Sequence, residues 1–250
     1  MNIRESVDSY DRETTQYIVA FLDMLGTDRR MRQENDIQKL SLNKLHNLYT
    51  RAVELTEKEK GLKFLEGVEL KMFSDNIIIT KKYPIDLLGR KLAVYSILNL
   101  VSHFQCSAVG DSVGWLVRGG ITIGKLFIDN MMVWGTALLR AYELENKVAV
   151  YPRVAIDSAI MPDILAHSEL NDCVLRDFDG VHFLNYMSIW HFADEIVYDG
   201  FQLIKSDARK PDGSFSDRIE QNLFWHMNYI NCELDRKDER KIKGCRLSLD

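Results

Sequence analysis

Two aspartates stand at the ends of predicted β-strands and are the first candidates for chemistry. Asp23 ends the apolar run 17–22, and Asp75 lies between two short β-rich runs, 68–73 and 77–80. Two carboxylates that approach each other repel unless a cation lies between them, and their oxygen ligands suit Mg²⁺ or Mn²⁺. A pair of such ions about 4 Å apart supports in-line phosphoryl displacement. The competing interpretation, which spacing alone favours, is that Asp23 caps the next helix and Asp75 makes an Asx turn.

Glycines around these segments shift the balance towards a ligand site. Gly26 follows Asp23 by three residues, and Gly119, Gly120 and Gly124 interrupt a β-rich stretch. Glycine inside a strand often marks the close approach of a ligand or another backbone, although a β-bulge is the competing explanation. We also expect the backbone N–H groups of the turn 24–28, at the start of a helix, to form a phosphate cradle.

The order of predicted elements gives a fold that would bring the two aspartates together. Hydrophobic periodicity predicts strands and helices in the order β-α-β-β-α-β, followed by a further helix and strand. This is the split βαβ, ferredoxin-like arrangement of the α+β class, an antiparallel sheet covered by helices, in which the first strand lies beside the hairpin. The segments are strand 17–23, helix 37–55, hairpin 68–80, helix 87–104, two strand-like stretches within 113–127, helix 135–147 and strand 151–157.

The remainder of the chain reads as an extension of the same domain. Asp179-Gly180 predicts a hairpin between strands 174–177 and 181–186, and the charge-rich segment 216–243 predicts a long helix. The sequence shows no internal repeat and no low-complexity linker. We therefore expect one domain over residues 1–250, with a core of about 17–157 and a C-terminal hairpin and helix extension over 158–250.

Composition excludes several classes of partner. The chain has 250 residues, 46% of them hydrophobic and 28% charged, with a formal net charge of −5. An acidic chain is a poor default binder of nucleic acid, because a phosphate backbone calls for surplus Lys and Arg. The N-terminal 16 residues are polar, and the apolar runs are shorter than the ~20 residues of a membrane span. With four scattered cysteines, these features predict a cytoplasmic protein that binds neither nucleic acid nor membrane.

Four strings in order carry a resemblance: FLDMLG, KMFSDNIII, VRGGITIG and VWGTALLRAYELE. Over residues 17–157 they resemble the class III nucleotidyl cyclase catalytic domain, and more narrowly the Pycsar-type pyrimidine cyclases of bacterial anti-phage defence. The resemblance implies cyclisation of a nucleoside triphosphate to cyclic UMP or cyclic CMP with two metal ions. It also implies a homodimer with active sites at the subunit interface.

The resemblance assigns roles to individual residues. Asp23 and Asp75 match the two metal-binding aspartates, and Met24 matches the position whose backbone carbonyl adds a metal ligand. Leu25 and Gly26 lie in the turn expected at the phosphates, and Lys71 matches a lysine that reads the base. Arg118 matches a strand arginine near the triphosphate. Gly135 and Ala141 match small residues of the helix that usually carries transition-state-stabilising groups.

Three departures bear on the substrate. Met132 stands where adenylyl cyclases have a base-reading aspartate, and Leu139 and Glu143 replace the stabilising asparagine and arginine of the helix. A pyrimidine cyclase fits these losses better than a purine cyclase, with Arg118 or Arg140 supplying the positive charge. Lys71 donates hydrogen bonds only, which suits uracil, and no acceptor for a cytosine amino group is evident, so UTP is the preferred substrate. The alternatives are an adenylyl or guanylyl cyclase of the same fold and an inactive nucleotide-binding module.

Overall fold

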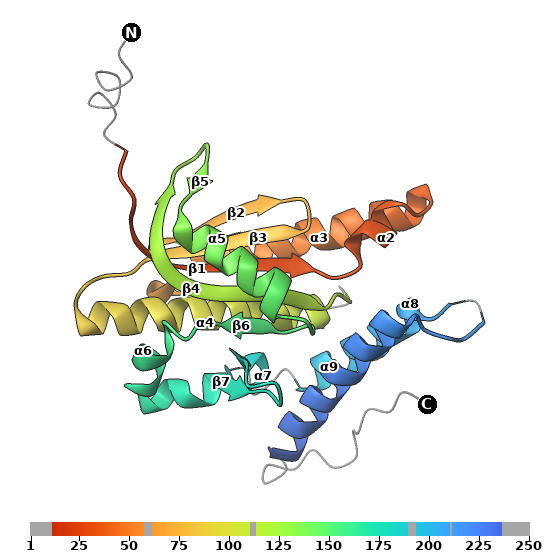
Figure 1. Cartoon of the computed structure of the whole chain (residues 1–250). Helices are drawn as coiled ribbons and strands as arrows, with labels where there is room; N and C mark the ends of the chain where they lie inside the picture. Colours follow the sequence, from red (N-terminus) through yellow and green to blue (C-terminus); the bar gives the residue numbers. More distant parts are fainter. Residues whose placement is uncertain (1–11, 58–61, 111–113, 190–193, 211, 237–250) are drawn as a thin grey trace.

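The computed structural model describes residues 12–57, 62–110, 114–189, 194–210 and 212–236. At its centre lies the antiparallel order β2-β3-β1-β4, which confirms the split βαβ prediction (Figure 1). The central strand β1 pairs with β3 on one side and with β4 on the other. The four strands are β1 (Thr15–Met24), β2 (Val68–Phe73), β3 (Asn76–Lys82) and β4 (Val117–Ile128).

Alternation along β1 assigns its side chains to two apolar layers. Ile18, Ala20 and Leu22 belong to the core beneath α4 (Leu87–Val109), whereas Tyr17 and Val19 pack with α5 (Thr136–Glu143). A strand with both faces covered reads as a continuous apolar run, as β1 does. The long helix α3 (Asn35–Thr56) contacts β2 and α4. Because Asp23 follows Phe21 by two residues, its side chain projects to the α5 side of the sheet.

The sheet continues beyond β4. The strand β6 (Val154–Ile156) runs parallel to β4, and the hairpin of β7 (Val174–Arg176) and β8 (His182–Leu184) extends the sheet further. This confirms the predicted hairpin at Asp179-Gly180. The remaining elements are short: α2 (Thr27–Met31), β5 (Val133–Trp134), α6 (Met161–Leu165), α7 (Tyr186–Ile189), two 3₁₀ turns (Lys63–Leu65 and Ser168–Cys173) and a π-helical turn (Leu144–Val148).

Two helices complete the C-terminal part of the chain, α8 (Asp194–Ala208) and α9 (Asp217–Arg236). The start of α9 agrees with the predicted helix 216–243, while its predicted end lies outside the described residues. Helix α8 was not predicted. Both helices pack in a second apolar core that takes in Cys106 and Val109 at the end of α4.

The glycine pair of β4 marks the close approach of another backbone, as one of the interpretations drawn from the sequence predicted, and not a β-bulge. The two strand-like stretches form one continuous strand whose register with β1 is regular from Val117 to Leu126, so there is no bulge. A Cβ on Gly120 would lie 2.4 Å from the Leu144 side chain and 2.5 Å from the Ala141 carbonyl oxygen. A helix backbone, and no ligand, therefore requires glycine here.

One described helix, α4, is long and apolar enough to cross a membrane, and 83% of its apolar window is buried inside the protein. Its hydrophobicity is accounted for by its place between two cores. Among the described residues, Cys106, Cys173 and Cys232 form no disulfide, and Cys245 lies outside the described residues.

Candidate active site

The fold brings the two predicted aspartates together. Asp23 lies opposite Asn76 in the β1–β3 pairing, and the backbone N–H of Met24 donates to the Asp75 carbonyl oxygen at 3.3 Å. Asp75 belongs to a tight turn in which Ser74 has a left-handed φ of 56°. From α3, the Tyr49 hydroxyl reaches the Ser74 and Asn76 carbonyl oxygens at 3.3 and 3.4 Å. These contacts hold the hairpin tip against the end of β1.

The charge around Asp23 is unbalanced towards acid. Arg118 lies opposite Asp23 on β4, and one of its guanidinium nitrogens is 3.3 Å from the Asp23 carboxylate and 2.5 Å from that of Glu145. Burial and the negative charges of Glu145 and Asp75 raise the pKa of Asp23 to about 6, although Arg118 opposes the shift. Burial also raises the pKa of Glu145. Such a cluster favours an added cation.

The capping interpretation of Asp23 is not supported by the geometry. Gly26, and not Asp23, occupies the N-cap position of α2. Gly26 adopts a left-handed φ of 84°, which explains the need for glycine there. The carboxylate of Asp75 accepts a hydrogen bond of 3.3 Å from the side chain of its neighbour Asn76.

The predicted phosphate cradle is partly occupied by the protein itself. The backbone N–H of Met24 is bonded to Asp75, and that of Leu25 donates to the Leu116 carbonyl oxygen at 2.9 Å. The Met24 carbonyl oxygen, the predicted extra metal ligand, accepts the Thr27 hydroxyl at 2.8 Å. A carbonyl oxygen has a second lone pair, so this bond leaves it able to contact a cation as well.

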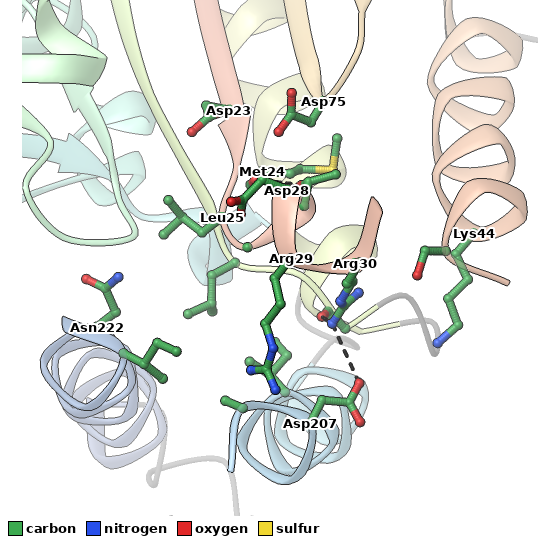
Figure 2. Close-up of a pocket in the computed structure, with 18 of the residues that line it drawn as sticks. Asp23, Met24, Leu25, Asp28, Arg29, Arg30, Lys44, Asp75, Asp207 and Asn222 are labelled. Atoms are coloured by element: carbon green, nitrogen blue, oxygen red, sulfur yellow. Dashed lines mark hydrogen bonds and ion pairs between the residues drawn. The ribbon is translucent and has the colours of Figure 1, made fainter. Parts of the chain in front are cut away.

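A cavity of about 700 Å³ opens beside the two carboxylates (Figure 2). This volume lies in the range of sites that hold small ligands and cofactors. The cavity is lined by the end of β1, the turn into α2, one face of α3 and the C-terminal helices α8 and α9. Of the predicted site residues, those in its wall are Asp23, Met24, Leu25, Gly26, Asp75 and Arg118.

The pair of carboxylates fits magnesium or manganese bound together with a phosphate substrate. Among the described residues there is no group of three or more His, Cys, Asp or Glu side chains that could form an all-protein metal cage. Mg²⁺ typically binds through one or two carboxylates, with water and substrate phosphates completing its shell. Asp23, Asp75 and the Met24 carbonyl match that pattern.

Three other predicted residues lie away from the cavity. The guanidinium of Arg140 is bonded to Asp157 at 2.7 Å, and Asp157 also accepts the Thr122 hydroxyl. Lys71 lies opposite Ile78 on the α5 side of the sheet, and Met132 is 47% exposed in the β4–β5 turn. None of the three lines the cavity. A single chain thus assembles the carboxylates and Arg118 without Lys71, Met132 and Arg140.

Several site residues were not found from the sequence. Glu145 is 4% exposed and contacts Arg118 from the π-helical turn after α5. Arg29, Lys44 and Arg218 line the cavity from α2, α3 and α9. For Glu145, the sequence shows only an acidic residue near the predicted end of an amphipathic helix, and an acidic residue at that position is expected to face solvent.

The mixed sheet and the helices that cover it match the fold of a class III nucleotidyl cyclase catalytic domain. The chain is similar to the monomeric guanylyl cyclase domain of the RhoGC fusion protein from the aquatic fungus Blastocladiella emersonii. The TM-score is 0.51 at 13% identity, over 70% of this chain and 96% of that domain. It is also similar to the catalytic core of a rhodopsin-guanylyl cyclase with converted specificity in complex with ATPαS, at a TM-score of 0.46 and 15% identity, over 70% of this chain and 97% of that one. No family model and no curated protein sequence matches the chain.

Proposed function

We propose that the chain is a nucleotidyl cyclase that converts a nucleoside triphosphate into a 3′,5′-cyclic monophosphate and pyrophosphate. The observation that carries the proposal is that Asp23 and Asp75 meet in the wall of one cavity, at the edge of a cyclase-type sheet. In the reaction the ribose 3′-hydroxyl loses its proton to solvent and its oxygen bonds to the α-phosphorus, as the bond from that phosphorus to the pyrophosphate oxygen breaks.

Some residues of this chain would bind the metal ions, and another would supply positive charge to the phosphates. Asp23 and Asp75, with the Met24 carbonyl, would hold two divalent ions, which supply charge neutralisation for the attacking and leaving oxygens. Arg118 lies between Asp23 and Glu145 on β4, and in this proposal its positive charge stabilises a phosphate oxygen. Arg118 lines the cavity and Arg140 does not, so we assign the cationic role to Arg118.

For the base we propose a pyrimidine, with UTP preferred over CTP. The support is chemical: Lys71 can only donate hydrogen bonds, and Met132 offers no carboxylate to an adenine amino group. We further propose a cytoplasmic enzyme whose cyclic product serves as a second messenger in anti-phage defence, detected by a separate effector.

A homodimer would supply what one chain lacks around the nucleotide. Phe73, Leu139 and Tyr142 are 81%, 66% and 47% exposed, and all three belong to the α5 side of the sheet, the side to which Asp23 projects. Exposed apolar side chains on one face are typical of an interaction surface. A second copy bound there would bring its own side chains close to Lys71.

The test is incubation of the purified protein with each of the four ribonucleoside triphosphates and Mn²⁺, with cyclic nucleotide and pyrophosphate both quantified. We expect cyclic UMP as the main product, and about a thousandfold less of it from an Asp75→Asn control. A purine product would retain the cyclase and reject the pyrimidine assignment.

The absence of all four products would reject the cyclase. The second candidate, an inactive nucleotide-binding module, is favoured by Leu139 and Glu143 at the positions of the usual stabilising groups. It predicts that a triphosphate raises the melting temperature without release of pyrophosphate.

A further inference from the structure

The two carboxylates of the proposed metal site lie at one end of the cavity, and the C-terminal helices lie at the other. Figure 2 shows Asp23 and Asp75 at one end, with the helices that carry Asp207 and Asn222 at the other and Arg29 extending between them. The far wall consists of α8 and α9, which belong to the C-terminal extension and not to the split βαβ core.

Some charged side chains of the cavity wall form ion pairs with each other, and the others do not. Arg118 pairs with Asp23, and Arg30 lies 3.6 Å from Asp207. Within the described part of the chain, no ion pair or hydrogen bond engages the side chains of Arg29, Lys44 and Arg218. The remaining acids are Asp75, at the proposed metal site, and Asp28, an exposed residue of α2. Once Asp75 binds a cation, three positive side chains face a single carboxylate.

The side chain of Arg30 is held by contacts within the protein. Its guanidinium donates to the Gly114 carbonyl oxygen at 2.7 Å and lies 4.5 Å from the centre of the Trp115 ring. Its contact with Asp207 connects α2 to α8. These contacts hold the neighbouring Arg29 on the cavity side of α2, as Figure 2 shows.

We propose that Arg29, Lys44 and Arg218 bind the phosphate chain of the substrate, so that the C-terminal helices form part of the nucleotide site. The inference rests on the proposed cyclase function and extends it to residues outside the cyclase core. Three cations from three separate helices converge on one cavity, and guanidinium groups bind phosphate oxygens through two parallel hydrogen bonds. The side-chain amide of Asn222, also in the wall, can donate to the same oxygens.

Position along the cavity decides which phosphates these residues contact. The α-phosphorus must lie near Asp23 and Asp75 for the reaction to occur. The β- and γ-phosphates then extend towards Arg29 and the α8–α9 wall, where the leaving pyrophosphate also remains after cyclisation. Free pyrophosphate and the phosphate chain of a triphosphate therefore share one set of contacts.

Calorimetric titration of the intact protein tests the proposal without reliance on turnover. Three probes are compared in the presence of Ca²⁺: inorganic pyrophosphate, UTP and uridine. Arg29→Gln and Arg218→Gln should each weaken pyrophosphate and UTP about tenfold, the loss expected for one charged hydrogen bond, and leave any uridine binding unchanged. Lys125→Gln, which removes an exposed positive charge on β4, is the matched control and should bind as the wild type does.

The proposal would be overturned if Arg29→Gln and Arg218→Gln bound pyrophosphate and UTP as tightly as the wild type does. It would also be overturned if the wild type bound neither pyrophosphate nor UTP. Circular dichroism melting curves show whether each variant is folded. The cyclase itself is judged separately by product formation from the wild type, so the two ideas can fail independently.

Discussion

The backbone N–H of Met24 donates a 3.3 Å hydrogen bond to the carbonyl oxygen of Asp75, so the end of β1 is joined to the tip of the β2–β3 hairpin. Two residues separated by 51 positions thereby hold the neighbouring Asp23 carboxylate beside that of Asp75. The bond is made by backbone groups, so the side chains can be changed while the turn is retained. Aspartate-to-asparagine substitutions at Asp23 and Asp75 can therefore test the carboxylates without loss of this backbone bond.

Asp75→Asn should lower cyclic nucleotide formation by about a thousandfold, because several kcal/mol of charge stabilisation is lost with the carboxylate. The backbone bond to Met24 is unaffected, so the melting temperature should stay close to that of the wild type. Asp129→Asn is the control, since its carboxylate caps its own turn in the β4–β5 loop. Full activity of Asp75→Asn would remove the metal-pair mechanism.

Asp23 should destabilise the metal-free protein at neutral pH. Its folded pKa of about 6 lies above the ordinary 3.8, so between these values the folded state binds a proton that the unfolded state does not. Wild-type stability therefore rises, relative to Asp23→Asn, as the pH falls from 6 towards 4. In urea denaturation with a chelator at pH 7.5, Asp23→Asn should be more stable by about 1 kcal/mol, after allowance for solvent screening.

At pH 4 that stability difference should vanish, and a difference that does not change with pH would contradict the assignment. Added Mg²⁺ or Mn²⁺ should stabilise the wild type more than the variant, because an ion that binds only the folded state shifts unfolding by mass action.

Gly120→Ala should destabilise the fold by about 1–3 kcal/mol, because its Cβ would overlap the Leu144 side chain and the Ala141 backbone. Displacement of this helix would also move Glu145 away from Arg118. Gly124→Ala is the matched control, since its nearest neighbour would lie 3.3 Å away at the Ala137 methyl group. The melting temperatures of the two variants test this prediction. Equal melting temperatures would show that α5 and the turn after it can move to accommodate the added methyl group.

Leu139→Glu should dissociate the proposed homodimer, because it places a charge on the exposed apolar side of α5. Sedimentation velocity measures the change in mass. Ile85→Glu provides the control, since Ile85 is 98% exposed but lies in the loop before α4. A monomeric wild type, or a dimer unaffected by Leu139→Glu, would exclude this surface.

The core of the fold could be predicted because its signals are local. Three signals depend on neighbours in the chain: the continuous apolar run of β1, the polar turn at Ser74-Asp75, and the helical patterns of α3 and of the largely apolar α4. Strand order then follows from the split βαβ pattern, which brings Asp23 to Asp75.

The rest of the site depends on contacts between distant segments. Helix α8 escaped prediction, and with it the wall that carries Asp207. Glu145 lies at a helix end where an acidic residue is usually solvated, and only the close approach of that helix to Gly120 turns it towards Arg118. Arg140 was expected near phosphate, but Asp157 lies within reach of its guanidinium and binds it.

The helix α4 passes through both apolar cores, with Phe104 and Ala108 in the one beneath the sheet and Cys106 and Val109 in the one shared with α8 and α9. Unfolding of either core would therefore remove packing contacts from α4. The two halves of the chain are thermodynamically coupled, so heating should give a single transition, and the cavity between them should be lost in one cooperative step.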